Sequence, residues 1–467
     1  MLASRWIESK VGYIANYVNG YPFKPGDWSD DGRPIIRIET LTKRRDSGNR
    51  YQKMLDDRYS IGPGDIIISW SGSLGVYIWD RNEQGWLNQH LFKVSPDPRQ
   101  VDRAFFTLLA SHFLRDMSES THGSTLQHIT RPKFNSHPVL LPPLDEQRAI
   151  ARFLDRKSRR IAGFIRARQR MIALLNEQKQ AIIHHAVTRG LDPDVPLKPS
   201  GIDWLGDIPV HWSLVPSGRA MAEIGQGWSP VAGDENESGD QWSVLTLSAV
   251  KRGKFSPEAC KPIALALTPR PELELKVGDL LMTRANTRLL VGDVAIVDSV
   301  PPRLIFSDLI YRIRMDRQLI TPAYFALLMR SPYGRILIER EARASNETMV
   351  KLAASRIRQW PLPTPTIVEQ EDIVRSCAEA LAKLQATVEL HSREIELLRE
   401  YRTRLIADVV TGRLDIRDHP DAAEDAPDDD DETGLLDTLA MGDDTGDDPD
   451  AGDTEDANEP PSSASPG

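Results

Sequence analysis

The chain has 467 residues, of which 40% are hydrophobic, so it is long enough for about three domains and is not disordered throughout. No apolar stretch approaches the roughly 18 residues of a membrane span, and the two cysteines, Cys260 and Cys377, offer neither a disulfide framework nor zinc spacing. The net charge of −10 is concentrated at the end of the chain, because residues 418–467 hold 19 acidic residues and no lysine or arginine, whereas residues 1–417 hold 58 basic and 49 acidic residues.

These figures predict a soluble, cytoplasmic protein with a mildly basic body, which suits a polyanionic partner. In chain order, the first segment reads as mixed α/β. Residues 65–70 form an apolar run typical of a short strand, and residues 105–114 are typical of a short helix.

A long helix is predicted next, because residues 145–189 contain no proline and one glycine and carry apolar residues at helical spacing. The apolar residues expected to pair with another helix or to contact a partner are Ile150, Leu154, Ile161, Phe164, Met171, Leu175 and Ile182. A proline-rich linker follows over residues 191–211.

The second half repeats the first. When the sequence is shifted by 223 positions, residues 125–192 align with residues 348–415 without a gap. Identities include Glu146/Glu369, Gln147/Gln370 and Leu174/Leu397. Upstream the offset drifts from 206 to 218, as expected for loop insertions on a shared scaffold. The chain is therefore expected to contain a duplicated domain.

The second long helix has a matching apolar stripe, Ile373, Leu381, Leu384, Val388, Ile395, Leu398 and Leu405. Neither stripe would stay exposed, so we expect an α+β fold in which each of two tandem-repeat α/β domains precedes a long helix and the two helices pair antiparallel as a coiled-coil spacer. The expected bounds are a first domain over 1–144, a helix over 145–190, the linker over 191–211, a second domain over 212–367, a helix over 368–413, and a disordered acidic tail over 414–467.

Sequence motifs for catalysis are absent. There is no phosphate-binding P-loop, no dinucleotide-binding glycine motif and no cysteine or carboxylate at metal-ligand spacing around the histidines of residues 112–137. We therefore expect a binding protein that is not an enzyme, with no catalytic residue and no metal site.

Polar loops at repeat-equivalent places are the candidate DNA-contacting segments. Arginine and asparagine reach base edges, whereas serine, threonine and lysine suit phosphates. In the first half the candidates are Lys43, Arg44, Arg45, Ser69, Trp70, Ser71, Ser124, Thr125, Gln127 and His128. In the second half they are Lys251, Arg252, Lys254, Arg284, Asn286, Arg288, Asn346, Thr348 and Lys351. Different side chains on one scaffold are what two modules reading different sequences would show.

Three segments in a fixed order around this duplication resemble the specificity subunits of type I restriction–modification enzymes. They are Leu141-Pro142-Pro143-Leu144-Asp145-Glu146-Gln147, Trp204-Leu205-Gly206-Asp207-Ile208-Pro209-Val210-His211-Trp212, and Val410-Thr411-Gly412-Arg413-Leu414-Asp415. The resemblance covers about residues 5–417. The chain departs from the family pattern in lacking a counterpart of residues 204–210 before Trp6, and in its acidic tail.

The resemblance implies two target-recognition domains that read the two halves of an asymmetric, bipartite double-stranded DNA target. It also implies that two methyltransferase subunits, which bring S-adenosylmethionine, dock on the helices. Restriction–translocase subunits would bring ATP and Mg²⁺, and this chain would hold no cofactor. Two alternatives remain open: a non-DNA coiled-coil adaptor with two ligand-binding modules, and a self-sufficient nuclease or methyltransferase.

Overall fold

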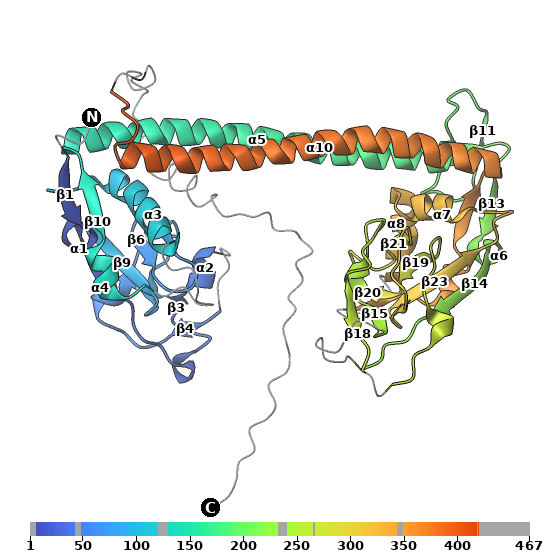
Figure 1. Ribbon diagram of the computed structural model, residues 1–467, viewed down its shortest axis with the longest axis horizontal. Helices are drawn as coiled ribbons and strands as arrows, with labels where there is room; N and C mark the ends of the chain where they lie inside the picture. The colour runs from blue at the N-terminus through green and yellow to red at the C-terminus, as the bar shows by residue number, and fades with distance from the viewer. Residues whose placement is uncertain are drawn as a thin grey trace, which may run out of the picture. The chain divides into compact units, whose positions relative to one another are not determined.

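The computed structural model describes residues 6–42, 48–119, 129–231, 241–264, 267–342, 349–417 and 419. The chain divides into two compact units, the first with residues 1–168 and 393–467 and the second with residues 169–392. Each of the two long helices, α5 (Leu144–Arg189) and α10 (Ile367–Val410), contributes one part to each unit (Figure 1). The tail expected to be disordered lies almost entirely outside the described residues.

A four-stranded antiparallel sheet in the order β2–β9–β6–β7 lies at the centre of the first unit. Its strands are β2 (Ala15–Asn19), β6 (Ile66–Ser69), β7 (Gly75–Ile78) and β9 (Leu91–Pro96). Beside it is a sheet in the order β4–β3–β8–β5, with strands β3 (Arg33–Ile36), β4 (Arg50–Tyr51), β5 (Ser60–Ile61) and β8 (Gly85–Leu87). Strands β3 and β8 are parallel. All four residues of β6 are buried, because the strand has neighbours on both sides and apolar side chains cover both of its faces.

Helix α3 (Arg103–Glu119) covers one face of this central sheet and also contacts the long helices. Its Phe105 and Leu109 belong to the same buried cluster as Ile68 of β6 and Ile406 of α10. One core therefore joins the first α/β domain to the long helices. The remaining elements of this unit are β1 (Ile7–Lys10), which pairs with β10 (Pro138–Leu141), α1 (Val11–Ile14), α2 (Ile38–Thr42), α4 (Arg131–Ser136), and 3₁₀ turns at Pro25–Asp27 and Asp57–Tyr59.

The second unit repeats this topology. Its central antiparallel sheet has the order β14–β23–β19–β21, with strands β14 (Met221–Gln226), β19 (Leu280–Thr283), β21 (Val294–Ile296) and β23 (Ile310–Met315). The second sheet, β18–β15–β22, again contains a parallel pair, with strands β15 (Ser243–Leu245), β18 (Cys260–Pro262) and β22 (Leu304–Ile305). Strand β13 (Ser213–Pro216) pairs with β25 (Pro361–Thr364), as β1 pairs with β10. The central sheets and the β1–β10 and β13–β25 pairs thus repeat in the two units, as the sequence duplication predicts, whereas the second sheet has four strands in the first unit and three in the second.

Helix α7 (Pro322–Met329) starts at Pro322, because the Thr321 hydroxyl accepts a hydrogen bond from the Tyr324 N–H at 3.2 Å and a proline is favoured in the first turn. The remaining elements of the second unit are β11 (Leu197–Pro199) paired with β12 (Asp207–Pro209), α6 (Ser217–Ala220), β16 (Val250–Lys251) paired with β17 (Lys254–Phe255), β20 (Ala285–Asn286) paired with β24 (Val350–Lys351), α8 (Pro332–Ala342), α9 (Ala354–Ile357), and 3₁₀ turns at Leu247–Ala249 and Pro271–Leu273. The expected linker thus contains a short β-hairpin.

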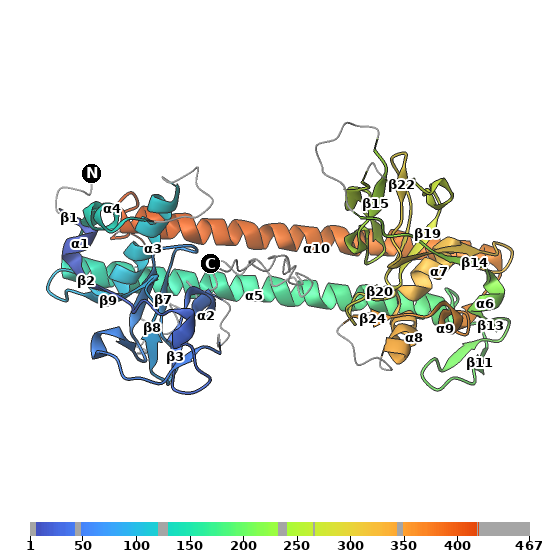
Figure 2. The same cartoon turned by 90° about the horizontal axis from the view of Figure 1, so that it is seen from below.

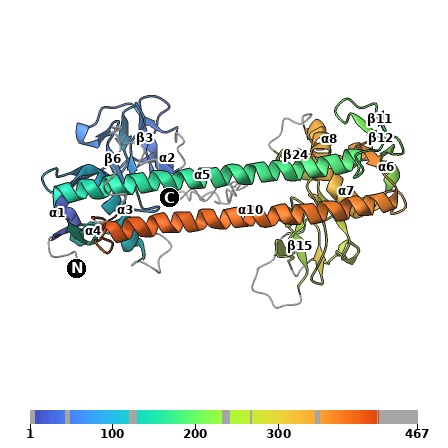
Figure 3. The same cartoon turned by 90° about the horizontal axis from the view of Figure 1, so that it is seen from above.

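The two long helices pair antiparallel within each unit (Figure 3). In the first unit, Leu154 shares a buried cluster with Leu405 and Ile406, and further along α5 Arg168 forms an ion pair with Glu394 at 2.6 Å. In the second unit, Lys179 donates a hydrogen bond to Gln385 at 2.7 Å, and Val187 shares a buried cluster with Ile373 and Cys377. Both helices end at a left-handed glycine, Gly190 and Gly412, with φ of +79° and +72°.

A buried glutamine at the start of each long helix holds the preceding domain. The Gln147 carbonyl oxygen accepts a hydrogen bond from the Asp102 N–H at 2.7 Å, and its amide donates to the carbonyl oxygens of Gln100 and Pro142 at 3.0 and 2.8 Å. Gln370 repeats the arrangement with the Thr321 N–H and the carbonyl oxygens of Leu319 and Pro365, at 2.9, 2.8 and 3.0 Å. Both glutamines are completely buried. We call these two residues the glutamine clamps.

Two residues of the predicted stripes, which were expected to pair with another helix or to contact a partner, do not contact the other helix. Phe164 and Met171 remain 54% and 43% exposed, whereas Ile165 is buried in place of Phe164. A straight helix has 3.6 residues per turn, so a stripe read at a 3.5-residue spacing drifts away from the contact line. Among the other residues of the predicted stripes, Ile150, Leu154, Ile161, Ile373, Ile395 and Leu405 are buried, and Leu175, Ile182, Leu381, Leu384, Val388 and Leu398 are half-buried.

Candidate nucleic-acid interface

In the second unit, two candidate loops that lie far apart in the sequence meet in a two-stranded sheet (Figure 2). Ala285 of β20 pairs with Lys351 of β24, and Asn286 pairs with Val350. Arg288 follows directly and is exposed, as is Lys351, whereas Asn286 is half-buried. This pairing places the amide of Asn286 and two cations on one edge of the domain. Asn346 and Thr348 lie outside the described residues.

Arg284 has a different role from its neighbours. Its guanidinium donates hydrogen bonds to the Tyr311 hydroxyl at 3.2 Å and to the Asp308 carbonyl oxygen at 3.4 Å, and it lies over the Tyr311 ring. These contacts direct the side chain into the domain. We therefore assign Arg284 to supporting the loop and retain Asn286, Arg288 and Lys351 as the candidate DNA contacts of this edge.

The third candidate segment of this unit is the hairpin of β16 and β17, which carries Lys251, Arg252 and Lys254. The Arg252 N–H donates to the Asp293 carboxylate at 2.9 Å. Asp293 follows the loop of Arg288 and is tied back to β19, since its carbonyl oxygen accepts from the Thr283 N–H at 2.8 Å. The hairpin therefore adjoins the loop that carries Arg288, and that loop begins with the strand that pairs with β24; we call these three segments the polar loop surface.

Below the hairpin tip lies Arg330, which follows α7. Burial lowers the pKa of its guanidinium, and the charge of Asp293 opposes that shift. Asp293 therefore contacts two neighbours: it accepts a hydrogen bond from the hairpin tip, and its negative charge attracts the Arg330 guanidinium.

In the first unit, the loop after β6 is built like the loop after β19. The Trp70 carbonyl oxygen accepts from the Ile129 N–H at 3.3 Å, as the Arg284 carbonyl oxygen accepts from the Leu352 N–H at 2.8 Å. The Trp70 indole stacks on Phe92 with a centroid separation of 5.6 Å. Trp70 thus corresponds to Arg284 and, like it, supports the loop, while Ser71 stays a half-buried candidate.

Ser69 is removed from the candidate set. It is completely buried, and its hydroxyl donates to the Ser73 carbonyl oxygen at 2.5 Å. The equivalent Thr283 is also buried and donates to the Leu290 carbonyl oxygen at 2.9 Å. Both hydroxyls therefore shape a turn and cannot reach DNA. The other candidates of this half, Lys43, Arg44, Arg45, Ser124, Thr125, Gln127 and His128, lie outside the described residues.

Three arginines that no sequence pattern singled out lie over aromatic rings in the first unit. Arg33 lies 4.7 Å from the Trp86 ring centroid, Arg58 lies 4.6 Å from the Tyr59 ring, and Arg37 lies 5.7 Å from the Trp28 ring. Trp28 is 45% exposed. Trp86 is completely buried, so Arg33 covers the core there, whereas Arg37 lies beside the exposed Trp28 and joins the candidate contacts of this unit. Only the adjacency of Arg58 and Tyr59 is visible in the sequence, because the other pairs form through folding.

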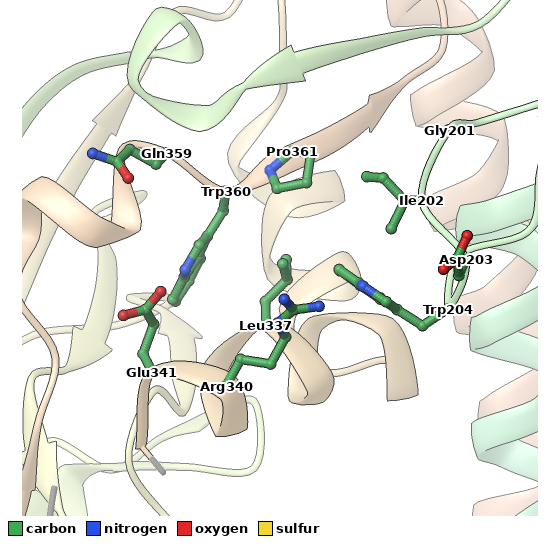
Figure 4. Close-up of a pocket in the computed structure, with 10 residues that line it drawn as sticks. All are labelled: Gly201, Ile202, Asp203, Trp204, Leu337, Arg340, Glu341, Gln359, Trp360 and Pro361. Carbon is green, nitrogen blue, oxygen red and sulfur yellow. The ribbon is translucent and has the colours of Figure 1, made fainter. Parts of the chain in front are cut away.

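A cavity of about 500 Å³ lies elsewhere in the second unit, between the β11–β12 turn, α8 and the start of β25 (Figure 4). Trp204 and Trp360 flank Leu337 there, and Arg340 lies 5.3 Å from the Trp204 ring centroid. The buried Trp360 Nε1 has no hydrogen-bond partner. None of the candidate DNA contacts lines this cavity, so it is distinct from the polar loop surface.

Within the described ranges, no three or more histidine, cysteine, aspartate or glutamate side chains gather as a metal site would require. No helix in the same part of the chain is long and apolar enough to cross a membrane.

Comparison with known proteins identifies relatives of one kind. Residues 3–168 match the type I restriction modification DNA specificity domain. The type I restriction enzyme EcoBI specificity subunit of Escherichia coli is 23% identical over 391 residues, which cover 81% of this chain and 79% of the relative. The MjaVIII specificity subunit of Methanocaldococcus jannaschii is 22% identical over 423 residues, or 88% of this chain and 93% of the relative.

The fold has a solved counterpart. A chain from a structural study of complex assembly and conformational transition in the type I R-M system aligns with a TM-score of 0.62 at 14% identity, over 89% of this chain and all of the other. The resemblance and the fold class predicted from the sequence are confirmed.

Proposed function

We propose that this chain, a relative of the type I restriction–modification specificity subunits, is the subunit that reads the DNA sequence in such a complex. The observation that carries the proposal is the duplication: two domains of one topology, each attached to paired long helices through a glutamine clamp, present different side chains on equivalent loops. A fixed scaffold with variable loops is suited to reading two different half-sites of one bipartite target.

The loop chemistry supports double-stranded DNA as the ligand. The converging surface of the second unit offers an asparagine amide, which can pair with adenine, and arginine and lysine side chains, which can pair with guanine or phosphate. The alternative function is a coiled-coil adaptor that does not bind DNA, and the methylation experiment described below distinguishes it from the specificity subunit.

The chain itself is proposed to be non-catalytic and to act in the prokaryotic cytoplasm. Methyltransferase subunits would bind S-adenosylmethionine, and restriction–translocase subunits would bind ATP and Mg²⁺. This division agrees with the absence of nucleotide-binding and catalytic motifs from the sequence.

The exposed apolar residues of the long helices support docking of two methyltransferase subunits. Leu174 and Leu397 are repeat equivalents, and they are 60% and 50% exposed. Phe164 and Met171 are also exposed on α5. Large apolar side chains that are exposed at equivalent places in both copies are expected where two identical partners bind in the same way.

Changing both leucines to glutamate should weaken methyltransferase binding by roughly 100-fold, because two carboxylates would be buried against an apolar partner surface. Affinity measured by titrating the purified methyltransferase subunit checks this. The Asn176→Asp change is the charge control and should have little effect, because Asn176 is exposed and lies about 160° around α5 from Leu174. Full affinity of the double variant would exclude this face as the docking surface.

The function is tested by expressing the chain with its methyltransferase subunit in a host without other adenine methylation and sequencing the modified bases. We expect one bipartite, asymmetric motif with an unread spacer, which disappears when the chain is omitted. Methylation that is independent of the chain, or sequence-independent DNA binding by the assembled complex, would contradict the proposal and favour the adaptor.

A further inference from the structure

The tip of the β16–β17 hairpin has an arginine in a backbone conformation that disfavours it. Lys251 pairs with Lys254, so Arg252 and Gly253 form a two-residue turn. Their φ angles are +50° and +81°. Positive φ at both positions defines the type I′ turn, whose first position prefers asparagine, aspartate or glycine. Arginine has no side-chain atom that can stabilise this conformation locally, so it is strained there.

The surroundings hold the tip in one position. The Arg252 N–H is fixed by the Asp293 carboxylate, and a side chain at position 253 would overlap the Arg330 guanidinium. A two-residue turn between paired strands has little freedom of its own. The hairpin therefore presents the residue at position 252 in a defined place, beside the loop that carries Arg288.

We propose that Arg252 is a specificity-determining residue that reads a base edge, with guanine as the expected base, in the half-site recognised by the second domain. This inference rests on the proposed DNA-recognition function. A phosphate contact needs only charge and can be made by a flexible lysine, whereas the planar guanidinium fork matches the two acceptors of guanine with a geometry that an ammonium group reproduces less well. The backbone at the tip is held by the Asp293 carboxylate and by close packing against Arg330, which fixes the point from which the Arg252 side chain extends, and a two-stranded β-ribbon fits the major groove.

The chain offers a matched control. Arg303 is the other non-glycine residue with positive φ in the described ranges, at +62°, and its N–H also donates to a carboxylate, that of Glu274, at 2.7 Å. It belongs to none of the candidate DNA-contacting loops. Arg303→Asn therefore relieves the same kind of strain without touching the polar surface.

The test compares Arg252→Asn, Arg252→Lys and Arg303→Asn in the complex with the methyltransferase subunits. Both asparagine variants should unfold at the wild-type temperature or a few degrees above it. Modified-base sequencing should show an unchanged motif for Arg303→Asn. Arg252→Asn and Arg252→Lys should accept other bases at one position of one half-site, with the rate ratio between the original and the substituted site falling roughly 10- to 100-fold.

A motif that Arg252→Lys leaves intact would overturn the inference, because charge alone would then suffice. So would an Arg252→Asn variant that methylates every sequence more slowly by the same factor and shows a weaker salt dependence, which is the signature of a phosphate contact. If Arg252→Asn folds but methylates nothing, the motif of the Arg252→Lys variant decides: a changed base at one position supports the inference, and an unchanged motif overturns it. Failure of the proposed DNA-recognition function would give a different result, because the wild-type complex itself would then methylate no defined motif.

Discussion

Replacing Gln147 or Gln370 with leucine should destabilise the unit that contains it by about 2–4 kcal/mol, because two carbonyl oxygens and one N–H would lose their partners in a buried place. Each substitution should loosen the attachment of one domain only. Hydrogen exchange should increase around residues 100–102 in Gln147→Leu and around residues 319–321 in Gln370→Leu.

Exposed helix residues of the same segments provide the controls. Arg152→Leu and Glu371→Leu change charge and helix surface without touching a clamp, and both should leave exchange at these loops unchanged. If either clamp variant were as stable as the wild type, the glutamines would not be the attachment points. Increased exchange in both units from one substitution would show that the two clamps are not independent.

Replacing Asn286, Arg288 and Lys351 together with alanine should reduce methylation of the specific target more than 100-fold, because the β20–β24 edge would lose an amide and two cations. Asn286 and Lys351 lie in a sheet whose pairing depends on backbone hydrogen bonds, and Arg288 lies in the loop that follows β20, so assembly with the methyltransferase should be retained. Initial methylation rates on an oligonucleotide with the intact target check the effect.

The Arg284→Ala variant distinguishes side chains that contact DNA from a side chain that stabilises the loop. Because Arg284 contacts Tyr311 and Asp308, its loss should lower thermal stability, whereas the triple alanine variant should unfold at the wild-type temperature. Full methylation by the triple variant would exclude this edge as a DNA contact.

The architecture could be predicted because helix length and duplication are visible in the sequence itself, without knowledge of contacts between residues that are distant in the chain. The proline-free stretches ended by Gly190 and Gly412 define both helices, and gap-free self-alignment reveals the duplication. The glutamine clamps were visible only as identities, Gln147/Gln370. Their partners, such as Asp102 and Thr321, are brought close by folding, so their function could not be read from the sequence.

The candidate site was predicted at the level of loops and only partly at the level of residues. Pattern alone could not tell Ser69, which is buried at a strand end, from the half-buried Ser71 two positions later. Pattern alone also could not show that the Arg284 side chain turns inward to bond Tyr311. Nor could it show that Ile165 is buried while Phe164 is exposed. Each of these outcomes depends on packing between elements that are separated in the chain.

The central claim is that each domain reads one half-site independently. The most direct measurement is modified-base sequencing of a host in which residues 212–360 are exchanged for the corresponding region of a relative with a known, different target. The account predicts a new motif in which one half-site is that of the relative and the other half-site is unchanged. A motif in which both half-sites change, or in which neither changes although the complex assembles, would contradict the assignment of one domain to one half-site.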